Sequence, residues 1–225
     1  MACGFCSLSR KVTVGWIGLP WLAAGALAQP EHAADWKLDP SHSELTVHVF
    51  KSGLFSGFLH DHLFVPGQWQ ASAKFDPAHV EELKAELTVA VGSLKDTEQK
   101  LSPEDRSKVE AQVAGPEVLD AKRFPEIRFM AERMKVSARK PDELEGILYG
   151  RLSLHGVTHS IDVPVHAWKR GDAQLVLGKV FFKQSEFGIA PLSKAGGAIS
   201  VEDRVLVDFS LRLVPSVQHA RWPPQ

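Results

Sequence analysis

Cysteine is almost missing from this chain of 225 residues, which contains only Cys3 and Cys6. Both lie within the first ten residues, so any domain formed by the later chain has no thiol. Such a domain can form no disulfide, offer no thiolate to a metal ion and use no cysteine nucleophile.

An excess of charge of either sign is also missing. Lys and Arg number 26 against 27 Asp and Glu, which gives a formal net charge of −1. No basic surplus exists to neutralise a run of phosphates or to hold an anionic membrane surface, so we expect no nucleic-acid partner. The remaining composition, 44% hydrophobic and 24% charged, is that of an ordinary globular domain.

Catalytic sequence motifs are missing as well. The chain has no Gly-x-Ser-x-Gly and no glycine-rich phosphate loop. His155 and His159 are four residues apart, but Gly156 between them indicates a turn, and the glutamate of a zincin motif is absent. A Ser/His/Asp site assembled from distant residues is left open by sequence. We expect a protein that is not an enzyme.

The N-terminal segment resembles a targeting signal. Arg10 and Lys11 precede residues 12–28, which carry no charge and end in the small-x-small pattern of residues 26–28. A retained membrane helix is the alternative, but glycines and a proline interrupt the apolar run. We therefore predict a signal peptide at residues 1–28, a linker at 29–35, a domain at 36–214 and a tail at 215–225, with no stable membrane insertion after cleavage.

Short alternating runs of apolar and polar residues follow and predict about eight strands, hence an all-β fold. The runs are residues 44–49, 86–91, 127–131, 148–154, 163–167, 175–177, 180–182 and 205–213. Strands at this spacing indicate one antiparallel sheet that closes on itself or packs against another. Two stretches break the alternation: residues 79–84 predict one helical turn, and Ser102-Pro103 predicts a helix that ends near Ala114, before Gly115-Pro116.

Five segments, in order, resemble the YceI-like family of exported lipid-binding proteins. They are residues 38–43 (LDPSHS), 118–129 (ending KRFPEIRF), 150–158 (GRLSLHGVT), 185–189 (SEFGI) and the final strand. The resemblance spans residues 36–213. It implies an extended lipocalin-like eight-stranded antiparallel β-barrel with one helix packed over one side, enclosing an apolar tunnel for a polyisoprenoid or similar lipid.

The alternation predicts which residues line such a tunnel. Six share the inward face of their strands: Val47, Val89, Phe129, Leu152, Val165 and Phe209. We expect Phe187 near one end, and Phe55 and Phe58, flanked by glycines, at a flexible mouth. Small inward residues, Gly150 and Ala131, leave room for a ligand. The same pattern would fit a barrel filled by its own side chains, so that alternative stays open.

The densest histidine group is His60-Asp61-His62. On an extended segment His60 and His62 share a face and could bind zinc or copper, with His42 or His48 as further ligands. The alternative is a solvated loop tip. Gln184 stands where many relatives have an arginine, which implies a less anionic lipid head, unless it is an outward strand residue of no consequence.

These observations lead to one leading functional prediction and one rival. The first is a periplasmic, non-enzymatic protein that sequesters or carries a polyisoprenoid or other long-chain lipid and needs no resident cofactor. The rival is a periplasmic metal-binding module that uses His60 and His62. A homodimer is left open.

Overall fold

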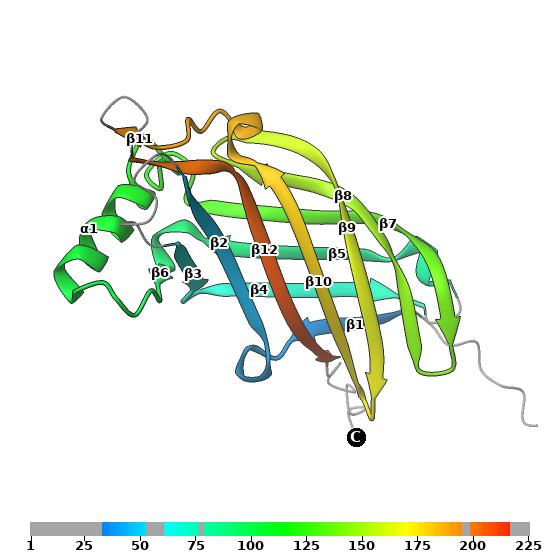
Figure 1. The fold of residues 1–225 in the computed structure, drawn as a ribbon. Coiled ribbons are helices and arrows are strands. Elements are labelled where there is room, and N and C mark those ends of the chain that lie inside the picture. Colours follow the sequence, from blue (N-terminus) through cyan, green and yellow to red (C-terminus); the bar gives the residue numbers. More distant parts are fainter. Residues whose placement is uncertain (1–32, 53–60, 77–78, 195–198, 217–225) are drawn as a thin grey trace, which may run out of the picture. The chain divides into compact units, whose positions relative to one another are not determined.

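The computed structural model describes residues 33–52, 61–76, 79–194 and 199–216. These residues form an antiparallel β-barrel with one α-helix, α1 (Pro103–Ala114), at one end (Figure 1). The strands are β1 (Ala34–Leu38), β2 (Glu44–Ser52), β3 (His62–Pro66), β4 (Trp69–Phe75), β5 (Lys84–Ala90), β6 (Leu94–Asp96), β7 (Glu126–Lys140), β8 (Glu143–Leu154), β9 (Val157–Arg170), β10 (Ala173–Lys183), β11 (Ser193–Lys194) and β12 (Ile199–Pro215).

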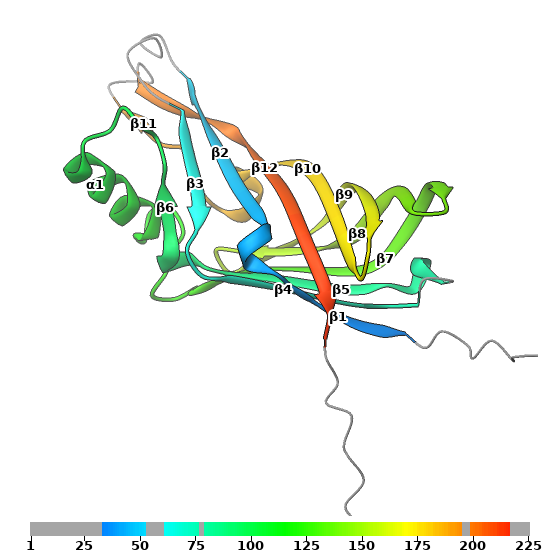
Figure 2. The ribbon, with the colours of Figure 1, turned by 90° about the horizontal axis from the view of Figure 1, so that it is seen from below.

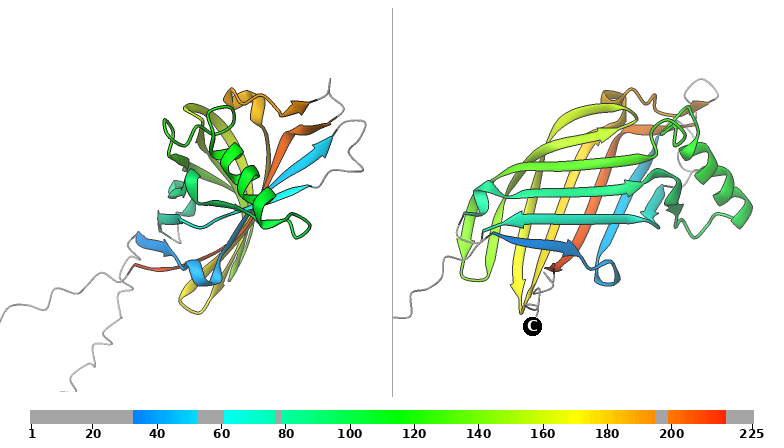
Figure 3. Two further views of the ribbon diagram at one scale, coloured as in Figure 1. Left: turned by 90° about the vertical axis from the view of Figure 1, so that its left-hand side faces the viewer. Right: turned by 180° about the vertical axis from the view of Figure 1, so that it is seen from behind.

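Eight strands close the barrel, in the order β1-β4-β5-β7-β8-β9-β10-β12, with β12 pairing back onto β1. The long β12 pairs with β2 over residues 200–210 and with β1 over residues 213–215. From β2 the sheet continues through β3 to β6. The junction where β12 pairs with both β2 and β1 is the seam of the barrel. Figures 2 and 3 show that β2 and β3 extend towards α1 and that β4 and β5 run along the opposite wall. The predicted all-β, eight-stranded antiparallel barrel with one helix is therefore confirmed.

The helix is present where its local signals predict it. The Ser102 hydroxyl accepts a hydrogen bond from the Asp105 backbone N–H at 3.1 Å, and Gly115 caps the other end. The predicted turn within residues 79–84 is a short 3₁₀ helix, Val80–Glu82. Among the described residues, no helix is long and apolar enough to span a membrane.

Two details of the strand prediction are wrong. The alternation does not reveal β3, which carries apolar residues on both faces, or β4, whose buried inward residues include the small Ala71 and Ala73. Residues 175–177 and 180–182 belong to one strand, β10. In that strand Leu177 faces outward and is 39% exposed. Because both faces of β10 carry apolar residues, the periodicity does not tell the inward face from the outward one.

Gly150 does not leave room for a ligand as expected. A Cβ atom placed on Gly150 would lie 2.8 Å from Phe129 Cε2, so the ring of Phe129 already fills the space above the glycine. A Cβ atom placed on Gly178 would likewise meet the ring of Phe209, its register partner on β12. Glycine at these positions therefore lets large aromatic rings lie flat against the barrel wall.

A hydrogen-bonded group ties the segment between β1 and β2 to the last strand. The Asp39 carboxylate accepts hydrogen bonds from the Ser41 hydroxyl at 2.7 Å and from Arg212 Nη1 on β12, and it pairs with His42 Nδ1 at 2.9 Å. The Ser43 hydroxyl accepts from the Arg212 backbone N–H at 2.8 Å. The Asp-Pro-Ser-His-Ser segment thus holds β1, β2 and β12 together.

This group predicts an acid-sensitive contribution to stability. The hydrogen bond from Ser41 lowers the pKa of Asp39 from 3.8 to about 2, and those from Arg212 and His42 add to this effect. Desolvation of the carboxylate acts in the opposite direction but is outweighed. A pKa that is lower in the folded state gives stability that is fully present above pH 3.8 and is lost as the pH falls towards about 2. We expect Asp39→Asn to be less stable than the wild type at neutral pH and to show a shallower loss between these pH values. Urea midpoints measured against pH check this, and parallel curves for the two proteins would contradict it.

Candidate functional site

A large cavity of about 850 Å³ lies inside the barrel. Residues of β2 to β10, of β12 and of α1 line it, and most of them are Val, Leu, Ile, Phe or Ala. The volume falls in the upper part of the range of ligand pockets, roughly 300–1,000 Å³. The interior is therefore not completely filled by the barrel's own side chains.

The cavity runs between two chemically different ends. At the α1 end its wall includes Val109 and Val113 of the helix together with the polar side chains of His62, Gln112 and Gln184. At the other end, where the β7–β8 hairpin closes, the lining residues include Arg139, Lys140, Asp142, Glu143 and Lys169. Most of the polar lining residues thus lie at the two ends, and the wall between them is mainly apolar, with Ser72 and Glu86 as its polar members.

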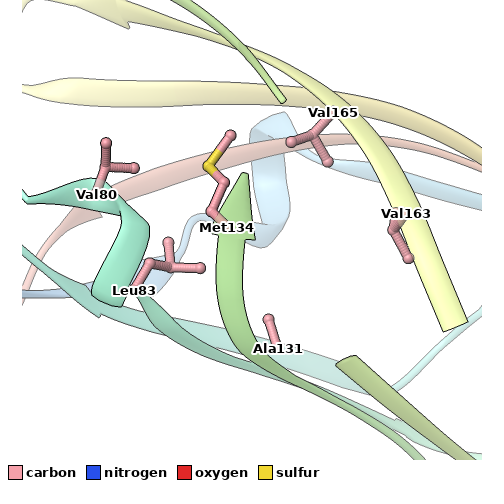
Figure 4. Close-up of a cluster of buried hydrophobic side chains, with 6 residues drawn as sticks. All are labelled: Val80, Leu83, Ala131, Met134, Val163 and Val165. Atoms are coloured by element: carbon pink, nitrogen blue, oxygen red, sulfur yellow. The ribbon is translucent and has the colours of Figure 1, made fainter. Parts of the chain in front are cut away.

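A cluster of buried side chains forms part of the cavity wall. Figure 4 shows its members, which are Val80, Leu83, Ala131, Met134, Val163 and Val165. All except Ala131 also line the cavity. Met134 is 5% exposed and reaches between the 3₁₀ segment and β9, so its flexible side chain sets how much space is open there.

The predicted tunnel residues mostly lie at this wall. Those that line the cavity are Val47, Val89, Phe129, Leu152, Val165 and Phe209. Phe55 and Phe58 lie outside the described residues, so their place at a mouth stays a prediction.

Phe187 differs from expectation. Its side chain is 1% exposed and is not part of the cavity lining, because it packs behind Leu119, Leu154 and Ile189, which do line the cavity. The edge of the Phe182 ring meets it at a centroid distance of 5.4 Å. Phe187 therefore anchors the segment after β10 and does not face the cavity.

Gln184 is not an outward strand residue. It begins the short 3₁₀ helix Gln184–Phe187, is 8% exposed and lines the cavity. Its side-chain amide donates a hydrogen bond to the Glu202 carbonyl at 2.7 Å. The residue that the family resemblance singled out thus lies at the polar α1 end of the cavity.

The histidines occupy separate places. His62 lines the cavity and pairs with Asp96, His42 pairs with Asp39, and His48 stacks on Phe50. His60 lies outside the described residues, so metal binding by His60 and His62 stays a prediction. His155 and Gly156 both have positive φ, at 50° and 76°, and form the tight turn between β8 and β9, as Gly156 predicts.

Another group with metal-ligand chemistry lies near the hairpin. Atoms of Glu143, Glu145 and His166 lie within 4.8 Å of one another. Glu143 already pairs with Lys140 at 2.8 Å and with His166 at 2.6 Å, and these two partners hold the pKa of its carboxyl below the usual value. The ion pairs of Glu143 with Lys140 and His166 therefore explain why these three side chains lie together.

A closed eight-stranded antiparallel barrel around an apolar cavity is the architecture of lipocalin-like binding proteins. The YceI-like domain model matches residues 36–213, and the chain belongs to the YceI-like family.

Similar solved structures include BcnA of Burkholderia cenocepacia, with a TM-score of 0.61, 23% identity, and coverage of 78% of this chain and 98% of that one. A polyisoprenoid binding domain from Saccharophagus degradans has a TM-score of 0.59 and 14% identity over 82% of this chain and 100% of that one. The YCEI protein of Campylobacter jejuni has a TM-score of 0.50 and 18% identity over 68% and 84%. At these identities the likeness shows the fold. No match was found among curated proteins.

Proposed function

We propose that this protein is a non-enzymatic binding protein that holds a polyisoprenoid or another long-chain lipid in its barrel. The observation that carries the proposal is the cavity of about 850 Å³ with a mainly apolar wall. The similar domain from Saccharophagus degradans, which is described as polyisoprenoid binding, supports an isoprenoid chain as the ligand.

The energetics of burial fit a chain-like ligand. Each methylene group removed from water contributes about 0.8 kcal/mol, so a chain of roughly ten or more carbons can offset the cost of association. No charged group is needed along the middle of the wall. A protein of this kind would sequester or carry its ligand without altering it.

The proposal includes export to the periplasm. Its support is the positive start, the uncharged run and the small-x-small pattern of residues 1–28, together with the resemblance to exported proteins. A cysteine-free domain at residues 36–214 folds without any need for disulfide chemistry in that compartment.

One experiment tests ligand and export together. Native mass spectrometry of protein purified without detergent from its source cell should show an added mass, which organic extraction releases as a lipid. The protein mass itself should correspond to a chain that begins at or near Gln29. Protein without any lipid, before and after incubation with polyisoprenol vesicles, would refute the binding function, and intact Met1 on most molecules would refute export.

A further inference from the structure

A carboxylate is buried at the α1 end, where β3 and β6 continue the sheet beyond the eight strands of the barrel. Asp96 of β6 lies opposite Phe64 of β3 in the strand register, so the two side chains share the inward face. The Asp96 side chain is 0% exposed. Aspartate is almost never fully buried unless it is paired, so its partners define what this part of the wall does.

The partners of Asp96 fix the orientation of His62. One carboxylate oxygen accepts a hydrogen bond from the Glu98 backbone N–H at 2.9 Å, and the other accepts from His62 Nδ1 at 2.6 Å. His62 faces inward beside Val49, lines the cavity, and keeps 22% of its side chain exposed. Because Nδ1 is held by the carboxylate, Nε2 is the one polar atom of the ring left for a ligand.

The charge around this end favours an uncharged ligand head. The polar lining residues here are His62, Gln112 and Gln184, and the amide of Gln184 already donates to Glu202. Among the described residues, the lysines and arginines that line the cavity all lie at the opposite, hairpin end. A phosphate or carboxylate would meet the buried Asp96 carboxylate behind His62, and no lysine or arginine among the described lining residues at this end would balance the two charges.

Resting on the proposed function, we propose that His62 is the head-group residue of the cavity and that its Nε2 accepts a hydrogen bond from a hydroxyl group on the ligand. The ligand class is an uncharged apolar chain that ends in an alcohol or phenol. Asp96 is the positioning residue, because it holds the ring with Nε2 free.

The test compares three probes with the same chain: farnesol, its methyl ether, which lacks the hydroxyl donor, and farnesyl phosphate, which is anionic. Each competes with N-phenyl-1-naphthylamine, a fluorescent apolar probe, for delipidated full-length mature protein. We expect farnesol to bind roughly tenfold more tightly than the ether, as one hydrogen bond inside an apolar site allows, and farnesyl phosphate to bind more weakly than farnesol.

Substitutions of His62 test whether this residue causes the preference for farnesol over its methyl ether. His62→Leu should bind farnesol and the ether equally while still binding the fluorescent probe. His79→Leu is the matched control, because His79 forms a similar pair with Asp76 at 3.2 Å on the surface and is 71% exposed. If His62→Leu fails to fold because Asp96 is left unpaired, His62→Leu combined with Asp96→Asn removes the buried charge and gives the same readout.

The outcomes separate the two proposals. If no probe displaces the fluorophore, the lipid-binding function itself fails. If all three probes displace it equally, or farnesyl phosphate binds best, the cavity binds chains but the hydroxyl assignment is overturned. Near-stoichiometric zinc in tag-free wild type that is lost in His62→Leu would also overturn it, because Nε2 would then be a metal ligand.

Discussion

Replacing Leu152 by tryptophan is expected to abolish the recovery of bound lipid and to leave the fold intact. Leu152 lies on β8 opposite Phe129 of β7, faces inward and lines the cavity. An indole there adds bulk where the structure has open space, so it would occupy ligand volume without displacing its neighbours. Native mass spectrometry for lipid and thermal unfolding of delipidated protein measure the two effects.

The control is the same substitution on the outer face. Leu177 of β10 is 39% exposed, so Leu177→Trp should keep both lipid and stability. A filled barrel behaves differently, since overpacking costs about 1–3 kcal/mol. A delipidated Leu152→Trp protein with a strongly lowered melting temperature, together with no lipid in the wild type, would show that the cavity is not a ligand site.

Replacing Gly150 by alanine is expected to destabilise the protein by about 1–3 kcal/mol, although only one methyl group is added. The new Cβ atom would meet the Met130 carbonyl oxygen and lie 2.8 and 2.9 Å from two carbons of the Phe129 ring. The ring can turn away, but the carbonyl belongs to the neighbouring strand and moves only with the backbone. Urea unfolding monitored by circular dichroism gives the loss of free energy.

Gly92→Ala is the matched control for this substitution. A Cβ atom there would have nothing within 4 Å, and Gly92 has no positive φ, so its stability should stay near that of the wild type. In a Phe129→Leu background, Gly150→Ala should cost less than in the wild type, and the remaining cost is the part due to the carbonyl. Equal stability of the two alanine variants would mean that neither the Met130 carbonyl nor the Phe129 ring obstructs a side chain at position 150.

Local signals predicted the helix and the inward positions of most strands. Ser102 and Gly115 define α1 by chemistry contained within a few residues, so sequence reading places both ends correctly. Alternation places Val47 and Phe209 at the cavity because each lies in a strand with one apolar face and one polar face. It fails for β3 and β10, because both faces of these strands carry apolar residues.

The polar end of the cavity was harder to foresee. The sequence indicates His62 only as one of a histidine pair, His60 and His62. Its partner in the structure, Asp96, lies 34 residues further along the chain in the short β6. Nothing in the local sequence Leu94-Lys95-Asp96 indicates a buried carboxylate. The pair exists because β3 lies beside β6, and that neighbourhood follows from the sheet order rather than from any motif.

The seam at β12 has a consequence for how the chain folds. Closure joins Trp36 to Pro215, the two ends of the domain, and the Asp39–Arg212 pair strengthens the same junction. Until β12 is in place, β10 presents an unpaired edge on one side, and β1 and β2 present unpaired edges on the other. Folding therefore depends on contacts of very long sequence separation, which form slowly. A chain that stops short of residue 199 has no strand with which to shut its interior, and the open edges would recruit one another between molecules.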